Sequence, residues 1–387
     1  LKFGSGPDYA LALLWYDGQS VPSEISNKDF YFPGEEVASM RDSWNSTNET
    51  YLGIRAGKPS ETHSDLDAGT FVFDSSGVRW AKDYGAGDYG SFGYWDNTEN
   101  GGRWKNFTKR AEAHNILVIN PGAGNEFPVN YDTKITHFES NNNEAIAVMN
   151  LTSAQSRNAT KAIRGFFYTD NRKSVVVRDE VSLKTDSELY WFMQTDADVA
   201  VKDNGAVLSY GGKKMNLEFV TNAESSKIYA TDAVPLESSD VVYNNAKGKR
   251  IAIKLTAKGD VNITVKLSPD GISASDVAQF DKPIDTWVSV NMHDMDIVSS
   301  NSKVLIDSDN NRIAVEQLPF YFNGYSLKTQ DLMSALSSNK YMLSYVDSEL
   351  VPASKNYFTD GYIKAINKNN SDDVKYIPVV PYKKDEK

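Results

Sequence analysis

The chain has 387 residues, of which 40% are hydrophobic and 12% aromatic, and this is enough for two or three domains with a sizeable core. A formal net charge of −11 and a pI near 5.0 exclude nucleic-acid binding through the overall electrostatic field. The absence of cysteine excludes disulfides, thiolate catalysis and cysteine metal sites, and no apolar run approaches the roughly 20 residues of a membrane-spanning helix.

Residues 1–29 are predicted to form one short helix followed by a polar linker. The helix covers residues 8–16, with Asp8 as its N-cap after Pro7 and Gly18 just beyond its end. A short apolar helix cannot bury its own face alone, so we expect it to have packed against further helices. The chain begins at Leu1 without a methionine or a signal-peptide pattern, which predicts a processed or truncated piece of a longer protein.

From Phe30 to about residue 275 the pattern predicts a large antiparallel β-sandwich. Apolar residues alternate at strand spacing, and turn signals such as Asp203-Asn204-Gly205 and Tyr210-Gly211-Gly212 separate the runs. The clearest predicted strands are Val37–Trp44, Thr50–Gly57, Ala145–Met149, Ala162–Tyr168, Ser174–Val181, Leu189–Met193, Ala206–Tyr210 and Arg250–Leu255.

A smaller β-rich domain is predicted for residues 285–387, after a pause in the pattern near Pro269–Gly271. We expect it to begin with a strand at Thr286–Val290, to contain a helix at Thr329–Ser337 and to end in a hairpin of Gly361–Ile366 and Val374–Val379. The predicted fold class is therefore all-β, with a large sandwich, a short N-terminal helical segment and a small C-terminal domain.

Three candidate metal ligands lie in the first strands of the predicted sandwich. Asp65, Asp83 and His114 are 18 and 31 residues apart, which suits one ligand from each of several neighbouring strands. Zinc and similar ions take three or four ligands of this kind from rigid elements. The alternative is that Asp65 and Asp67 cap a turn while Asp83 ends a strand, and the spacing alone leaves both interpretations open.

A basic segment with interleaved aromatic residues follows a loop rich in glycine and tyrosine. Its candidate substrate-binding residues are Arg103, Trp104, Lys105, Lys109 and Arg110. Guanidinium and ammonium groups pair with carboxylate or sulfate, while aromatic rings pack on sugar faces, so the segment suits an acidic sugar. The alternative is a strand or loop whose charges only face solvent.

The loop also carries Tyr84, Tyr89 and Tyr94, for which packing is the default interpretation and proton transfer the alternative. His137 and His293 have no comparable neighbours and are interpreted as surface or ordinary core residues. The sequence contains no P-loop, dinucleotide fingerprint, Gly-x-Ser-x-Gly elbow or His-Glu-x-x-His motif.

Three ordered motifs resemble the heparinase II/III-like polysaccharide lyases: His63–Phe71, Gly77–Gly85 and Ala113–Leu117. Met40–Trp44 and Leu14–Asp17 support the resemblance, which covers roughly residues 8–260. Members join an N-terminal α/α toroid to a β-sandwich, so the resemblance implies that most of the toroid is missing from this chain. It also implies β-elimination on a uronic-acid polysaccharide, an acidic polysaccharide as partner, and a bacterial protein that is secreted, periplasmic or at the cell surface.

The resemblance also implies roles for single residues. His63 matches the active-site histidine of the family, and Asp83 and His114 match metal ligands. Asp65 stands where members carry a second zinc-binding histidine. The resemblance therefore implies zinc, and this difference adds calcium or no metal as alternatives. Tyr94, or failing it Tyr89, is the predicted catalytic tyrosine of the loop.

Two other function classes stay open at this point. The first is a carbohydrate-binding or cell-surface module that keeps the fold without the catalysis. The second is a glycoside hydrolase in which Asp65 and Asp67 form the acid–base pair. The toroid of the family supplies an asparagine or histidine and a tyrosine that have no counterpart here, so the chain is expected to be inactive alone.

Overall fold

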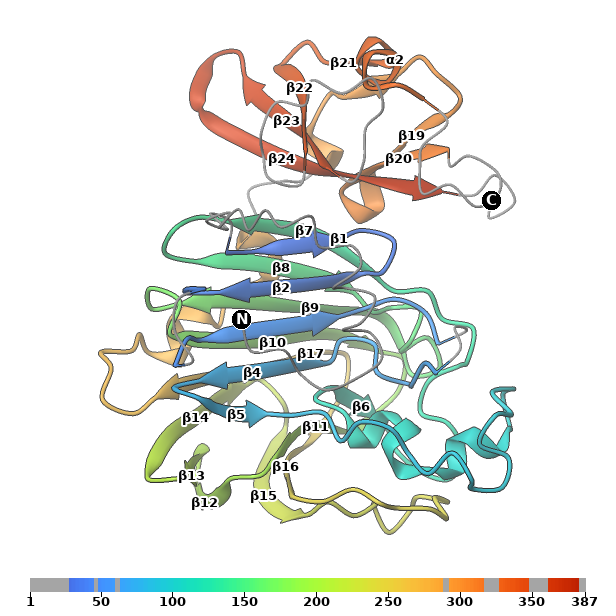
Figure 1. Cartoon of the computed structure of the whole chain (residues 1–387), viewed down its shortest axis with the longest axis vertical. Coiled ribbons are helices and arrows are strands. Elements are labelled where there is room, and N and C mark those ends of the chain that lie inside the picture. Colours follow the sequence, from blue (N-terminus) through green and yellow to red (C-terminus); the bar gives the residue numbers. More distant parts are fainter. Residues whose placement is uncertain are drawn as a thin grey trace, which may run out of the picture.

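The computed structural model describes residues 28–44, 48–59, 63–287, 292–316, 327–347 and 361–382. The predicted helix at residues 8–16 lies outside these ranges. Within them the chain is almost entirely β, as predicted, and the larger part is a sandwich of antiparallel sheets (Figure 1).

One layer of the sandwich is an eight-stranded antiparallel sheet. In spatial order its strands are β12 (Asp198–Lys202), β13 (Gly205–Tyr210), β14 (Lys213–Thr221), β17 (Asp260–Pro269), β10 (Ser174–Leu183), β9 (Ala159–Thr169), β8 (Ala145–Asn150) and β7 (Lys134–Ser140). The β13–β14 hairpin turns through Gly211 and Gly212, whose φ angles of +55° and +77° suit a two-residue turn of the type that matches strand twist.

The opposite layer consists of two sheets that adjoin. The five-stranded sheet has the order β1 (Phe30–Phe32), β2 (Val37–Arg41), β3 (Tyr51–Arg55), β4 (Phe71–Ser75) and β5 (Val78–Ala81). The four-stranded sheet has the order β15 (Ser225–Asp232), β16 (Lys249–Ala257), β11 (Ser187–Thr195) and β6 (Leu117–Ile119). The two sheets meet where the Lys82 N–H donates to the Gln194 carbonyl at 2.9 Å.

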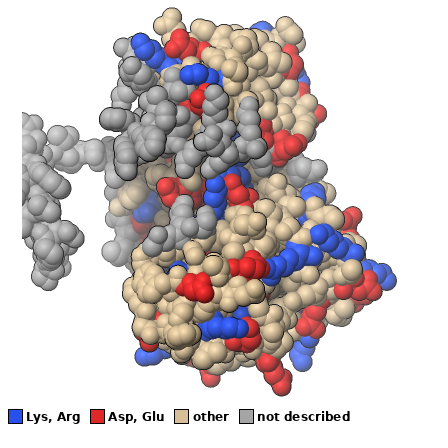
Figure 2. Space-filling model, turned by 90° about the vertical axis from the view of Figure 1, so that its right-hand side faces the viewer, with Lys and Arg blue, Asp and Glu red and all other residues tan. Residues whose placement is uncertain are grey.

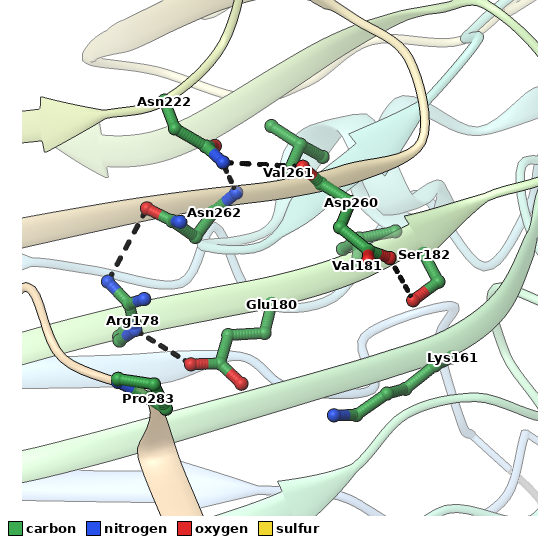
Figure 3. A pocket seen from close by; sticks show the side chains of 10 residues that line it. All are labelled: Lys161, Arg178, Glu180, Val181, Ser182, Asn222, Asp260, Val261, Asn262 and Pro283. Carbon is green, nitrogen blue, oxygen red and sulfur yellow. Dashed lines mark hydrogen bonds and ion pairs between the residues drawn. The ribbon is translucent and has the colours of Figure 1, made fainter.

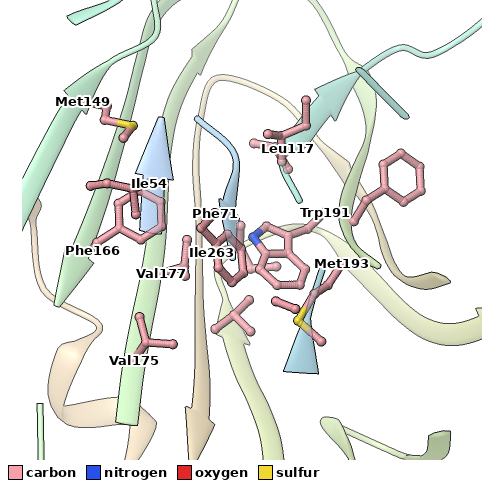
Figure 4. Packing of buried hydrophobic residues seen from close by; sticks show 14 of the residues in the cluster. Ile54, Phe71, Leu117, Met149, Phe166, Val175, Val177, Trp191, Met193 and Ile263 are labelled. Atoms are coloured by element: carbon pink, nitrogen blue, oxygen red, sulfur yellow. The ribbon is translucent and has the colours of Figure 1, made fainter. Parts of the chain in front are cut away.

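The core between the layers is apolar and aromatic. Phe71 of β4 lies edge-on to Phe166 of β9 at 5.8 Å and next to Trp191 of β11 at 6.2 Å (Figure 4). Val177 of β10 and Val265 of β17 are paired and fully buried. Each such side chain stabilises the fold by roughly 1.5–3 kcal/mol through removal from water, so this core fixes the loops that leave β4, β5 and β6.

A second buried cluster runs from Met292 to Val379 and belongs to a smaller sheet. Its strands in order are β19 (Val304–Asp307), β20 (Arg312–Glu316), β24 (Asn370–Tyr382), β23 (Gly361–Asn367) and β22 (Tyr341–Asp347), with only the β20–β24 pair parallel. A two-stranded sheet pairs β18 (Val298–Ser299) with β21 (Leu336–Ser337). Figure 1 shows this part above the sandwich, beside its edge strand β7.

The predicted C-terminal hairpin is confirmed, since β23 pairs with β24 and Ile366 lies opposite Val374. The predicted helix is confirmed as α2 (Thr329–Ala335), but its last two residues form β21 instead. The strand predicted at Thr286–Val290 is wrong at Thr286, because Ile284–Thr286 is the 3₁₀ turn η5, after which Trp287 packs against Gly165. Residues 288–290 of that predicted strand lie outside the described residues. The domain boundary predicted between residues 275 and 285 stays a prediction.

Short 3₁₀ turns complete the described structure. They are η1 (Gly102–Lys105), η2 (Phe107–Lys109), η3 (Ala111–Ala113), η4 (Val277–Phe280), η6 (Met292–Asp294) and η7 (Ser308–Asn310). Within the described ranges, no helix is long and apolar enough to cross a membrane.

Candidate functional site

The loop before β4 presents His63 to solvent. His63 is exposed and has a φ of +73°, a left-handed conformation that is uncommon outside glycine. The next carbonyl, of Ser64, accepts two hydrogen bonds from the Arg103 guanidinium, at 2.9 Å to Nε and 2.6 Å to Nη2. Because Arg103 is buried, the loop is held from beneath while the imidazole stays accessible.

Two exposed aromatic rings lie beside His63, and we call His63, Tyr89 and Trp95 the aromatic corner. The ring of Tyr89 is 5.8 Å from the imidazole and that of Trp95 is 5.3 Å from it, centroid to centroid. Tyr89 is 49% exposed and Trp95 57%. The two rings also lie 5.5 Å from each other, so the three side chains form one cluster. Accessible aromatic rings can pack on a sugar face, and an accessible imidazole beside them can exchange a proton with the sugar.

Tyr94, the first choice for the catalytic tyrosine, is buried beneath this corner. It is 1% exposed, its ring packs 5.0 Å from that of Tyr89, and the Arg103 guanidinium lies 4.9 Å from its centre. A group that meets substrate must be accessible, so the structure favours Tyr89 over Tyr94 for this role. No strand or helix sets the side-chain directions in this loop, and sequence spacing gave no basis for the choice.

The predicted basic patch is not an exposed patch. Residues 102–113 form the turns η1, η2 and η3, which bury four of the five predicted substrate-binding residues: Arg103, Trp104, Lys109 and Arg110. Lys105 is half-exposed and its ammonium pairs with Asp240. This corrects the interpretation of the segment as a row of sugar subsites.

The reason for the correction is internal charge pairing. Arg110 donates to Glu126 at 2.9 Å and to Asp240 at 2.8 Å, and its side chain is fully buried. The Trp104 indole N–H donates to the Thr98 carbonyl at 2.8 Å. Buried cations require such partners, and Asp240 lies 130 residues away from Arg110 in the chain, where no local pattern reveals it.

The ion pairs of Asp240 should make the stability of the fold depend on pH. Burial raises the pKa of this carboxyl, but hydrogen bonds from Lys105, the Gly124 N–H and Arg110 lower it, with a net pKa of about 2. Because its folded pKa is depressed, Asp240 contributes stability above its ordinary pKa and loses that contribution as the pH falls toward 2. We expect Asp240→Asn to be less stable than the wild type at pH 7, with the difference shrinking below about pH 4.

Denaturant unfolding of both proteins across this pH range measures the effect. Asp232→Asn is the control, because Asp232 is exposed and contacts Lys249 at 3.3 Å. A stability difference for Asp240→Asn that does not change with pH would contradict the assignment.

Asp83 and His114, two of the predicted metal ligands, contact each other directly. His114 Nδ1 lies 2.9 Å from Asp83 Oδ2, and Asp83 Oδ1 accepts the Gly85 N–H at 2.6 Å. Burial by itself lowers the pKa of His114, whereas the hydrogen bond and charge of Asp83, with other carboxylates nearby, raise it to about 9. The carboxylate beside Nδ1 thus favours the charged form of the imidazole.

Asp65, the third predicted metal ligand, is paired with cations. Its Oδ1 accepts from Lys109 Nζ at 2.8 Å and lies 3.5 Å from Arg103 Nη2. Within the described residues, no group of three or more histidine, aspartate or glutamate side chains is arranged to hold a metal ion. His114 Nε2 is buried without a protein hydrogen-bond partner. As arranged, the three side chains do not fit zinc or calcium.

Asp67 has a structural position. It is buried and pairs with Arg55 of β3 at 2.9 Å. Burial raises its pKa, and the Arg55 charge opposes this only in part. Asp65 and Asp67 are thus both engaged with cations, which leaves no free carboxylate pair for glycoside hydrolysis.

Two residues that sequence reasoning gave no role hold the site together. Arg164 of β9 is fully buried, pairs with Asp179 and donates to the carbonyls of Gly69 and Asn115 at 2.8 Å each. Asn115 donates to the carbonyls of Phe71 and Lys82 at 2.6 and 3.0 Å. Asn115 directly follows His114 in the Ala113–Leu117 motif, and this position was the only feature of the sequence that could have pointed to its role.

The turn into β4 depends on Gly69. Its φ is +90°, and a Cβ there would lie 2.6 Å from Leu151 Cδ1. We expect Gly69→Ala to lower the free energy of unfolding by about 1–3 kcal/mol, from backbone strain plus overpacking. Gly259→Ala is the matched control, with a φ of +62° but open space, and it reports the backbone strain alone. Equal losses in chemical denaturation would show that the contact with Leu151 is unimportant.

Two hollows lined by described residues involve none of the predicted site residues. One, of about 260 Å³, is lined by ten residues including Lys161, Arg178 and Glu180 (Figure 3). Arg178 donates to Glu180 at 2.9 Å and to Thr264 at 2.6 Å. Another lies over the five-stranded sheet, where Arg79 pairs with Asp74. Their charged groups largely neutralise one another.

Surface charge is mixed on the face drawn in Figure 2, where Lys and Arg side chains lie beside Asp and Glu. This agrees with the net charge of −11. An anionic polymer would meet no broad positive area on that face, so its recognition must depend on local contacts.

These features define a β-sandwich that carries an accessible histidine beside two exposed aromatic rings. The family model for the C-terminal domain of heparinase II/III-like proteins matches residues 33–316. The chain therefore belongs to the heparinase II/III-like family, as the motifs around His63, Asp83 and His114 predicted. No curated protein sequence matches the chain.

Solved structures agree in fold. The heparan sulfate lyase HepC from Pedobacter heparinus has a TM-score of 0.52 and 19% identity, covering 65% of this chain and 38% of its own length. A heparinase III gene product has a TM-score of 0.51 and 16% identity, covering 92% of this chain and 42% of its own length. The chain thus spans about 40% of the length of these lyases, and at this identity the likeness shows the fold alone.

Proposed function

We propose that this chain is the sandwich portion of a polysaccharide lyase that cleaves a uronic-acid polysaccharide by β-elimination. The observation that carries the proposal is the aromatic corner, in which the exposed histidine of the motif contacts two exposed aromatic rings that also contact each other. Family membership and the solved lyases of like fold support it.

β-Elimination removes a weakly acidic proton beside the sugar carboxylate and expels the glycosidic oxygen. It requires a base for that proton, an acid for the leaving oxygen and neutralisation of the carboxylate. In the proposed mechanism the His63 imidazole accepts the proton beside the carboxylate and the Tyr89 hydroxyl gives a proton to the leaving oxygen, while Trp95 packs on a sugar face. We assign neutralisation of the carboxylate to an N-terminal α/α toroid outside this chain, and we expect the chain alone to be inactive.

The proposal includes export, since acidic polysaccharides of this kind lie outside the cell. We place the protein in the periplasm, at the cell surface or in the medium of a bacterium. The zinc or calcium ion expected for the family has no fitting set of ligands here, so no catalytic step depends on it.

The alternative is a non-catalytic carbohydrate-binding module. The exposure of Tyr89, Trp95 and Phe92, which is 88% exposed, favours it, since aromatic rings on a surface bind sugars without any chemistry. The glycoside hydrolase hypothesis lacks such support, because Asp65 and Asp67 are each held by cations.

The test is to incubate the protein, as its full natural chain, with alginate, heparan sulfate and hyaluronan. Appearance of the unsaturated uronate chromophore supports the lyase. Binding without product supports the module, and saturated reducing ends indicate a hydrolase. If the protein neither forms a product nor binds any polysaccharide of this panel, both proposals are contradicted.

A further inference from the structure

Lys109 lies against Asp65, one of the three predicted metal ligands. Its side chain is 4% exposed, and its Nζ lies 2.8 Å from Asp65 Oδ1 and 6.0 Å from the ring centre of Tyr94. Its carbonyl also accepts the Leu66 N–H at 3.2 Å. Lys109 therefore contacts the loop that carries His63 through both its side chain and its backbone.

Two carboxylates of this region have a permanent cation supplied by the chain. Asp65 has Lys109 and Arg103, and Asp67 has Arg55, while Asp83 Oδ2 lies 2.9 Å from His114 Nδ1. A divalent ion bound to Asp65 would have to displace the lysine ammonium. Displacement leaves a buried charge without its partner, which is costly in a protein interior.

We propose that Lys109 is the resident cation of this centre, closing it to divalent metal ions and positioning the loop that presents His63. The departure of Asp65 from the family's histidine fits this arrangement, because a carboxylate pairs with an ammonium whereas an imidazole does not. The inference does not rest on the proposed function and holds whichever sugar the protein meets.

Metal analysis tests the first half of the proposal. The purified protein is stripped with EDTA, dialysed against zinc or calcium chloride and measured for bound metal and for thermal melting. We expect no stoichiometric metal and the same Tm in EDTA, zinc and calcium. About one equivalent of tightly held ion, with a Tm that falls on chelation, would overturn it, because an ion bound only by the folded state stabilises that state.

Substitution of Lys109 tests the second half. Lys109→Met keeps most of the side-chain volume and removes the charge, leaving Asp65 with only the longer Arg103 contact. We expect the Tm to fall by roughly 10 °C, as for loss of one partner of a buried pair. Lys254→Met is the control, because the pair of Lys254 with Glu188 is exposed at 38% and 45%, and its Tm should hardly change.

A double variant keeps the test decisive if Lys109→Met does not fold. Asp65→Asn with Lys109→Met removes both charges, so it should be more stable than Lys109→Met alone. Equal melting of the single and double variants, or a wild-type Tm for Lys109→Met, would overturn the assignment. None of these readouts requires turnover, so their failure is distinguishable from failure of the lyase proposal.

Discussion

Replacing Asp179 with alanine is expected to lower the free energy of unfolding by about 3–5 kcal/mol. Arg164 makes two 2.7 Å hydrogen bonds to Asp179, and both side chains lie in the core between the layers. Without Asp179 the guanidinium stays buried with only the carbonyls of Gly69 and Asn115 as partners. The loss of one partner costs more than the pair is worth, because an uncompensated charge remains.

Asp74→Ala is the matched control for this prediction. Asp74 forms the same two-bond pair with Arg79, at 2.7 and 2.8 Å, but that arginine side chain is 53% exposed. Water solvates the freed guanidinium, so the loss should stay below about 1 kcal/mol. Urea unfolding of the wild type, Asp179→Ala and Asp74→Ala measures both losses in the free energy of unfolding. Similar losses for the two variants would contradict the stabilising role of the buried Arg164–Asp179 pair.

Replacing His63 with alanine is expected to lower lyase turnover on the order of 10²- to 10⁴-fold without unfolding the protein. The imidazole is exposed and its loop is held by Arg103 rather than by His63 itself, so stability should not change. Turnover on the polysaccharide found active in the panel and circular dichroism measure the two effects separately.

Two further variants distinguish catalysis from packing at this corner. Tyr89→Phe keeps the ring beside His63 and removes the hydroxyl, so we expect a lower kcat with a nearly unchanged KM. His293→Ala removes an exposed histidine that pairs with Asp309 outside the corner and should leave turnover unchanged. Full activity of His63→Ala would place the proton transfer elsewhere.

The strands could be predicted because their chemistry is local. Val175, Val176 and Val177 are β-branched and buried in β10, whose observed span of Ser174–Leu183 extends the predicted one by two residues. Turn chemistry was equally local, as at Gly211 and Gly212. Prediction failed at Thr286, where an apolar aromatic run that resembles a strand instead begins as a 3₁₀ turn that packs Trp287 on the sheet.

Only those residues of the candidate site that lie in the three family-like motifs could be singled out from the sequence. The resemblance drew attention to His63, Asp83 and His114, and the structure shows that the last two contact each other. The pairing of Lys109 with Asp65, 44 residues apart, depends on how three consecutive turns fold, and no period of the sequence encodes it. The same turns bury Arg103 and Arg110, so a segment that looked like a surface patch proved to be a charged core.

The most direct test of the central claim is a time course of unsaturated uronate absorbance on an acidic polysaccharide, with the full natural chain and its His63→Ala variant side by side. The proposed function predicts a steady rise for the wild type and almost none for the variant. No rise for a folded wild-type protein on alginate, heparan sulfate and hyaluronan, or equal rises for both proteins, would contradict it.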